Sequence, residues 1–200
     1  NRSDKIIRKA DTDLGVTGLS TAQDLASLFI QLGQYSETDD ILTELLEEYE
    51  KTYGPNSIRL IEPLVNKGKL LLAQGDYTAA DKVALRANQI AVNTYTEKST
   101  KTASTQKLLS DIDYTIGDYD KAEDNITKAL ASQEKQFGRK HIDVAKSLAQ
   151  LALIKFYKGD DKNQVEKLML EARDIMGARL GKDNPQYADI LKNMAVLYIS

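Results

Sequence analysis

The chain has 200 residues, of which 42% are hydrophobic and 28% charged, and this ordinary globular balance argues against wholesale disorder. Its net charge of −3 disfavours general nucleic-acid binding, which needs a basic footprint. Because the chain has no cysteine, thiol catalysis, cysteine-ligated metal sites and disulfides are excluded, and a cytoplasmic location is compatible with that absence.

Glycine recurs along the chain at a fixed spacing. Gly33, Gly75, Gly117 and Gly159 follow one another at steps of 42 residues. A second series of large apolar residues, at positions 53, 95, 137 and 180, advances by 42, 42 and 43 residues. The last unit therefore holds one extra residue, which the register places between positions 159 and 165. A period of this length is typical of repeated helical units.

Between these markers the apolar residues follow a helical pattern. Ile41, Leu42, Leu45, Leu46 and Tyr49 show the three- and four-residue spacing of one buried helix face. Each unit is predicted to hold two antiparallel helices, A and then B, joined by a tight turn at the glycine, where a left-handed backbone ends the A helix. The expected helices are 18–32, 36–53, 57–74, 78–95, 100–116, 120–137, 141–158, 162–180 and 185–200, and no strands are expected.

The predicted fold class is all-α, a right-handed superhelical solenoid of antiparallel helix pairs with about nine or ten helices. One helix pair cannot bury its own apolar face, whereas stacked neighbours can. We expect a single repeat array over residues 1–200. Its parts are repeat 1 at 15–53, repeat 2 at 54–95, repeat 3 at 96–137, repeat 4 at 138–180 and the first helix of repeat 5 at 181–200, with 1–14 as the tail of a preceding helix or a linker.

The motif Gly-Asp-Tyr-x-x-Ala, present at 75–80 and 117–122, resembles the tetratricopeptide repeat, and the 42-residue unit resembles the kinesin-light-chain variety of it. The stretches 138–145 and 148–152 correspond to the Gly-x-x-His-Pro and Leu-Asn-Asn-Leu-Ala patterns of that variety. Ile142 replaces the proline, Thr38 stands where alanine is usual, and Lys67 stands where an apolar residue is usual. The resemblance implies recognition of a protein or peptide in a groove lined by A helices.

The groove-facing positions follow, through this resemblance, from the register before each turn glycine. Four lysines at such positions are predicted to form a basic line, with three aromatic residues as a wall beside it. The functional interpretation is a groove for an extended or helical peptide with acidic and apolar anchors. The alternative is that the lysines are solvated and the aromatic residues complete helix packing. The candidates are Lys69, Lys107, Asp111, Tyr114, Lys146, Leu153, Phe156, Tyr157 and Lys192, and the structural turn residues are Gly33, Gly75, Gly117 and Gly159.

The sequence offers little for catalysis or metal binding. His141, the only histidine, falls at a turn where the resembling family commonly has one, so a turn or capping role is expected. Asp11 and Asp13 faintly match a calcium loop that lacks its third ligand, its glycine and its final glutamate. We therefore expect no enzyme, no metal and no cofactor. The apolar runs are too short to span a bilayer, so no membrane is expected as partner. The net charge of −3 argues against a nucleic acid as partner.

The sequence thus predicts a protein–protein interaction scaffold that binds a peptide or partner helix in its concave groove. The partner would be another protein of unknown identity or another domain of the same chain. Two alternatives stay open: a regulatory repeat region that controls an enzyme or DNA-binding domain outside these residues, and a self-associating structural array.

Neither end of the sequence shows the polar capping helix that solenoids normally need. We therefore expect a piece of a longer protein, with weak end-to-end self-association possible through uncapped termini. The last helix is expected to expose apolar residues such as Met194, Ala195 and Leu197, or to cover them by contact with another molecule.

Overall fold

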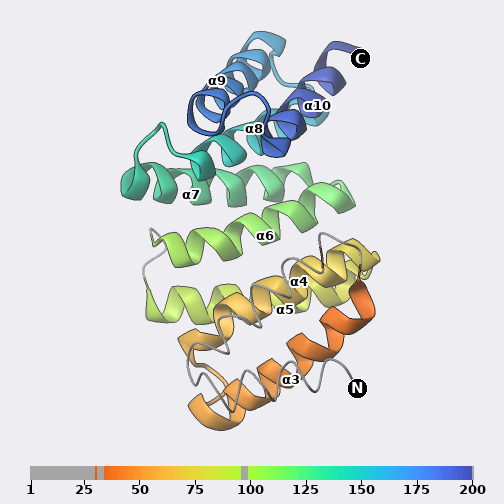
Figure 1. Cartoon of the computed structure of the whole chain (residues 1–200), viewed down its shortest axis with the longest axis vertical. Helices are drawn as coiled ribbons and strands as arrows, with labels where there is room; N and C mark the ends of the chain where they lie inside the picture. Colours follow the sequence, from red (N-terminus) through yellow and green to blue (C-terminus); the bar gives the residue numbers. More distant parts are fainter. Residues whose placement is uncertain (1–29, 31–33, 96–98, 200) are drawn as a thin grey trace. The chain divides into compact units, whose positions relative to one another are not determined.

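The computed structural model describes residues 30, 34–95 and 99–199, and the chain divides into two compact units, residues 1–94 and 95–200 (Figure 1). The described residues form eight α-helices and one 3-10 turn, which confirms the predicted all-α class of antiparallel pairs. The count is lower than the nine or ten helices expected. Apart from residue 30, the expected helix at 18–32 lies outside the described residues, as do the preceding tail and Gly33.

The first unit contains α3 (Tyr35–Tyr53), η1 (Ile58–Leu60), α4 (Ile61–Gln74) and α5 (Tyr77–Thr94). α4 packs against both α3 and α5, and η1 contacts all three helices. The predicted helix 57–74 was wrong at its start, because the α-helix begins only at Ile61. In a helix that began at residue 57, position 63 would lie in the interior, where its backbone N–H donates to the carbonyl four residues earlier. Proline has no such N–H. With the start at Ile61, Pro63 lies in the first turn, where no intrahelical donor is required.

The second unit contains α6 (Thr100–Ile116), α7 (Tyr119–Phe137), α8 (Ile142–Lys158), α9 (Lys162–Leu180) and α10 (Pro185–Ile199). Each helix lies within one residue of its predicted bounds. α6 pairs with α7 and α8 with α9, while α7 also packs on α8, and α10 packs on α8 and α9. Their facing sides form one apolar core that includes Ile126, Leu148, Ile154, Met169 and Met176.

A glycine–aspartate pair builds the turn from an A helix to its B helix. Gly75, Gly117 and Gly159 end α4, α6 and α8 with φ of 82°, 84° and 82°, the left-handed region that a side chain disfavours. The aspartate that follows caps the next helix. Asp76 accepts from the Ala79 N–H at 3.0 Å, and Asp118 accepts from the Lys121 N–H at 3.3 Å.

The turn before α9 has three residues, 159–161, whereas the turns before α5 and α7 have two, 75–76 and 117–118. α7 and α9 both contain 19 residues, so the extra residue lies in the turn and not in the helix. Two aspartates in this turn have different contacts. Asp161 caps α9 by accepting from the backbone N–H groups of Asn163 and Gln164, while Asp160 pairs with Lys155 at 2.8 Å. The insertion therefore falls inside the interval that the register predicted.

The two departures from the repeat pattern in the first unit are both satisfied locally. Thr38 is fully buried, and its hydroxyl donates to the carbonyl of Gln34 at 2.6 Å. Lys67 on α4 extends its Nζ to Asp39 at 2.6 Å and to the hydroxyl of Thr43 at 2.9 Å on α3. The helix pair therefore accommodates a lysine through an ion pair at a position where an apolar residue is usual.

A charged cluster fastens the end of α8 to the start of α7. Glu123 accepts from Lys155 and from Lys158, each at 2.6 Å, and Lys158 also pairs with Asp120 at 2.7 Å. The hydrogen bonds from the two lysines lower the pKa of Glu123 below the usual glutamate value. The carboxylate form of Glu123 therefore stabilises the folded state.

We expect this stabilisation to be present at neutral pH and to disappear as the pH falls through the lowered folded-state pKa of Glu123. Glu123→Gln should lower the free energy of unfolding by about 1 kcal/mol at pH 7, the upper range for a partly exposed pair. The gap to the parent chain should narrow once the pH falls below about 4.3, the ordinary glutamate pKa, and vanish below the lowered pKa of the folded state. Urea unfolding across that range measures it, with the exposed Glu44→Gln as a control of small effect at pH 7. A gap that stays constant with pH would contradict the role given to Glu123.

Candidate functional site

A groove of about 440 Å³ crosses α6, α8 and α10 in the second unit. We call it the A-helix groove. It brings together five of the nine predicted site residues, which are Lys107, Asp111, Tyr114, Lys146 and Leu153. Its other lining residues are Ala149, Gln150, Met176, Gln186, Asp189, Ile190 and Asn193.

Helical spacing explains why these side chains meet. On α6 the lining residues are 107, 111 and 114, on α8 they are 146, 149, 150 and 153, and on α10 they are 186, 189, 190 and 193. Steps of three and four residues place side chains on one face of a helix, one turn above another. Each A helix therefore contributes a single stripe about two turns long to the same groove.

The charge of Lys107 is compensated inside the groove. Its Nζ lies 3.0 Å from a carboxylate oxygen of Asp111 and donates to Oε1 of Gln150 at 2.9 Å. The amide of Gln150 in turn donates to the hydroxyl of Ser110 at 3.1 Å, which itself donates to the carbonyl of Ala122 at 2.8 Å. This chain of polar contacts fixes Lys107 and ties α8 to α6.

Lys146 differs from Lys107 in its polar contacts. It lines the same groove from α8 and is half-buried, and within the part of the chain that the structure describes it has no hydrogen bond or ion pair. Lys192 on α10 is exposed and pairs with Asp189 at 3.0 Å, and Lys69 lies exposed on α4 in the first unit. The structure therefore brings Lys107 and Lys146 to one groove, and of these two only Lys107 has an ion pair among the described residues.

The predicted aromatic residues meet at the end of α6 and α8. Tyr157 lies 5.7 Å from the ring of Tyr114 and 5.3 Å from that of Phe156, both edge-on. Burial and the neighbouring hydroxyl of Tyr157 raise the pKa of Tyr114 to about 12, so Tyr114 stays neutral. Of these three residues only Tyr114 lines the A-helix groove. Phe156 lines a smaller cavity, of about 270 Å³, with residues of α9 and α10.

Sequence reasoning missed Tyr119 as a member of this cluster. Its ring stacks on Tyr157 at 5.7 Å and lies 5.9 Å from Tyr114. The available signal was the Gly-Asp-Tyr motif, which places a tyrosine directly after the turn, beside the last residues of the preceding helix. The equivalent Tyr77 is 42% exposed, so the motif alone does not decide whether its ring joins a cluster.

His141 has the capping role expected from its position. Its Nδ1 accepts from the backbone N–H of Asp143 at 3.2 Å at the start of α8, and its ring stacks on Phe137 at 4.4 Å. Among the residues described, no group of three or more histidine or acidic side chains is arranged to hold a metal ion. Over the same residues, no helix combines the length and the hydropathy needed to cross a membrane.

α10 carries apolar side chains on its surface. Of the three residues named from the sequence, Ala195 is exposed, while Met194 and Leu197 are half-buried against the core of the second unit. The larger exposed residues are others: Tyr198 is 61% and Ile199 is 85% exposed. The helix therefore presents an apolar strip, with its most exposed part at the last described turn.

Comparison with known proteins gives both a family and a fold. A model of the tetratricopeptide repeat matches residues 18–91 and, overlapping with these, residues 60–135, together more than half of the chain. No curated protein sequence matches the chain significantly.

Solved structures similar to this chain share its architecture at low sequence identity. BtubC (BKLC) from P. vanneervenii aligns over 99% of this chain and 81% of its own, with a TM-score of 0.79 and 17% identity. A protein from Podosopora anserina, described as a kinesin light chain with nearly identical TPR-like repeats, aligns over 90% of this chain and 85% of its own. Its TM-score is 0.71 at 18% identity, and a point variant of it scores 0.72. The likeness shows a common fold.

Proposed function

The chain belongs to the tetratricopeptide repeat family, and we propose that its A-helix groove binds a peptide or helix from a partner protein. Repeats of this family are generally protein-interaction modules and usually lack catalysis. The observation that carries the proposal is the convergence of Lys107, Asp111, Tyr114, Lys146 and Leu153 on one groove from separate helices.

The chemistry of the groove favours a peptide with an acidic and an apolar anchor. Lys146 offers a cation without an ion pair among the described residues, and Leu153, about two turns farther along α8, offers an apolar contact. Gln186 and Asn193 on α10 carry amides that can both donate to and accept from a peptide backbone. Lys107 is held in place by Asp111 and Gln150 before any ligand arrives, which lowers the ordering cost of binding.

Reversing the two groove lysines should abolish this binding. Peptides selected from a random display library on the parent chain supply the ligand, and isothermal titration calorimetry measures its affinity. The variant Lys107→Glu/Lys146→Glu should weaken that affinity about a hundredfold or more, because it replaces attraction by like-charge repulsion inside the groove.

The matched control is Lys82→Glu/Lys182→Glu, which makes the same charge change at two exposed lysines outside the groove. It should alter the affinity less than about twofold, since rim and surface charges contribute little. Circular dichroism establishes that both variants fold. Equal affinity for the parent chain and the groove variant would refute the site.

The two other functions considered from the sequence stay predictions. A regulatory repeat region would use the same groove for a neighbouring domain. A self-associating array would use the apolar strip of α10, where Tyr198 and Ile199 are exposed.

A further inference from the structure

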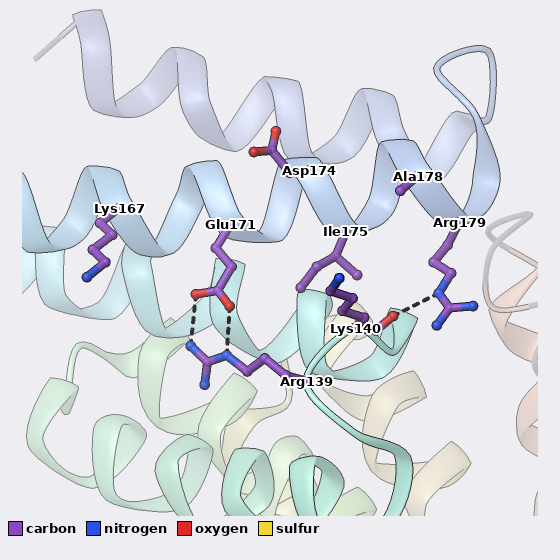
Figure 2. Close-up of a pocket in the computed structure, with 8 residues that line it drawn as sticks. All are labelled: Arg139, Lys140, Lys167, Glu171, Asp174, Ile175, Ala178 and Arg179. Atoms are coloured by element: carbon purple, nitrogen blue, oxygen red, sulfur yellow. Dashed lines mark hydrogen bonds and ion pairs between the residues drawn. The ribbon is translucent and has the colours of Figure 1, made fainter.

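A second groove lies outside the A helices, between α9 and the turn that joins α7 to α8 (Figure 2). We call it the α9 groove. Its volume is about 860 Å³. The lining residues Lys167, Glu171, Asp174, Ile175, Ala178 and Arg179 come from one side of α9, and Arg139 and Lys140 come from the turn.

Two contacts hold the turn against α9. The guanidinium of Arg139 donates from Nε and Nη2 to the two carboxylate oxygens of Glu171, at 2.7 and 2.8 Å, and it also pairs with Glu134. Farther along the helix, Nε of Arg179 donates to the carbonyl of Lys140 at 2.9 Å (Figure 2). Residues 171 and 179 are about 12 Å apart along a helix, so the turn is fixed to α9 at two separate points. The groove is therefore formed before a ligand binds, which lowers the entropic cost of binding.

The charges in this groove do not cancel. Glu134 and Glu171 set two carboxylates against the single charge of Arg139, which leaves one negative charge over, and nearby Lys167 helps to lower the pKa of Glu171. Asp174 pairs with Arg173, which does not line the groove, at 2.6 Å.

Three further cations line the groove, and they outnumber that one excess carboxylate. Lys140 and Lys167 form no ion pair with any residue that the structure describes, and among the same residues Arg179 hydrogen-bonds only through Nε, to an uncharged carbonyl. The α9 groove therefore presents a surplus of positive charge on a protein whose net charge is −3.

The spacing of the cations sets the length of a ligand. Residues 167 and 179 are about 18 Å apart along α9, which an extended chain covers with about six residues. Ile175 and Ala178 lie between them and give the groove an apolar floor. Glu171 and Asp174 lie in the same wall and would repel the evenly spaced phosphates of a nucleic acid. A peptide can place its carboxylates only where the cations are.

We propose that the α9 groove binds an extended acidic segment of a partner protein, about six residues long. Carboxylates of the segment pair with Lys167, Lys140 and Arg179, and an apolar side chain packs on Ile175 and Ala178. This surface is separate from the A-helix groove, so the chain can hold two segments at once.

The test uses a fluorescein-labelled hexapeptide, Glu-Leu-Glu-Glu-Leu-Glu, and fluorescence anisotropy on the whole chain in the Lys107→Glu/Lys146→Glu background. That background removes the A-helix groove as an acceptor, so failure of one proposal is distinguishable from failure of the other. In it, Lys140→Glu/Lys167→Glu should raise the Kd about tenfold, because two exposed attractions become repulsions. Lys82→Glu/Lys182→Glu should change the Kd less than about twofold.

Three results would overturn the proposal. The first is loss of peptide binding in the background alone, which would place the peptide in the A-helix groove. The second is an equal effect of both lysine pairs, which would indicate attraction by overall charge. The third is tighter binding of hexa-deoxythymidylate than of the peptide, lost with the same lysines, which would assign the surface to nucleic acid.

Discussion

Leu148→Ala is expected to lower the free energy of unfolding by about 2–5 kcal/mol, the range for deleting a fully buried leucine side chain. Leu148 on α8 has no exposed surface, and the buried core to which it belongs also includes Ala122, Ile126 and Met169. These residues come from α7 and α9, the helices on either side of α8. A cavity at Leu148 therefore loosens α8 from both of them, and the backbone can close it only in part.

Urea unfolding followed by circular dichroism measures the loss. Leu85→Ala on α5 is the matched control, because the same atoms are removed from a side chain that is 51% exposed, and it should cost less than about 0.5 kcal/mol. If both substitutions cost the same, the packing described around α8 is wrong.

Ala122→Leu is expected to cost about 1–3 kcal/mol, although leucine forms helices almost as well as alanine does. Ala122 on α7 is fully buried, and its carbonyl accepts the hydrogen bond from Ser110 on α6 at 2.8 Å. A larger side chain has to push α7 away from α6. That movement also strains the hydrogen bonds that connect Ser110 through Gln150 to Lys107. The position of Lys107 in the A-helix groove should therefore change as well.

Ala131→Leu places the same side chain on an exposed position of the same helix. It should change the free energy of unfolding by less than about 0.5 kcal/mol. Urea unfolding measures both variants. An equal loss of free energy of unfolding for the two would show that the packing around Ala122 can accommodate a larger side chain.

The fold was predictable because its determinants are local and repeated. A turn glycine every 42 residues and an apolar face at three- and four-residue spacing locate each helix, and both signals survive at low sequence similarity. The one helix start that was wrong, at Ile61, depended on the backbone chemistry of Pro63, which a search for apolar spacing ignores.

The groove was harder to predict because contacts between repeats decide it. Register alone placed Lys107, Lys146 and Leu153 on the A helices, and the structure brings them to one groove. The hydrogen bond from Lys107 to Gln150 joins residues that are 43 positions apart in the sequence. The spacing of residues within one helix cannot predict a contact between two helices. The same holds for Arg139 and Glu171, 32 residues apart, which build the wall of the α9 groove.

An extra residue inside a helix would rotate every later side chain by roughly 100° about the helix axis. Because the added residue lies in the turn at 159–161, it does not change the spacing of side chains along α9. Of the two adjacent aspartates there, Asp161 caps α9 and Asp160 pairs with Lys155. A repeat of 43 residues therefore keeps on its B helix the same buried face as a repeat of 42 residues.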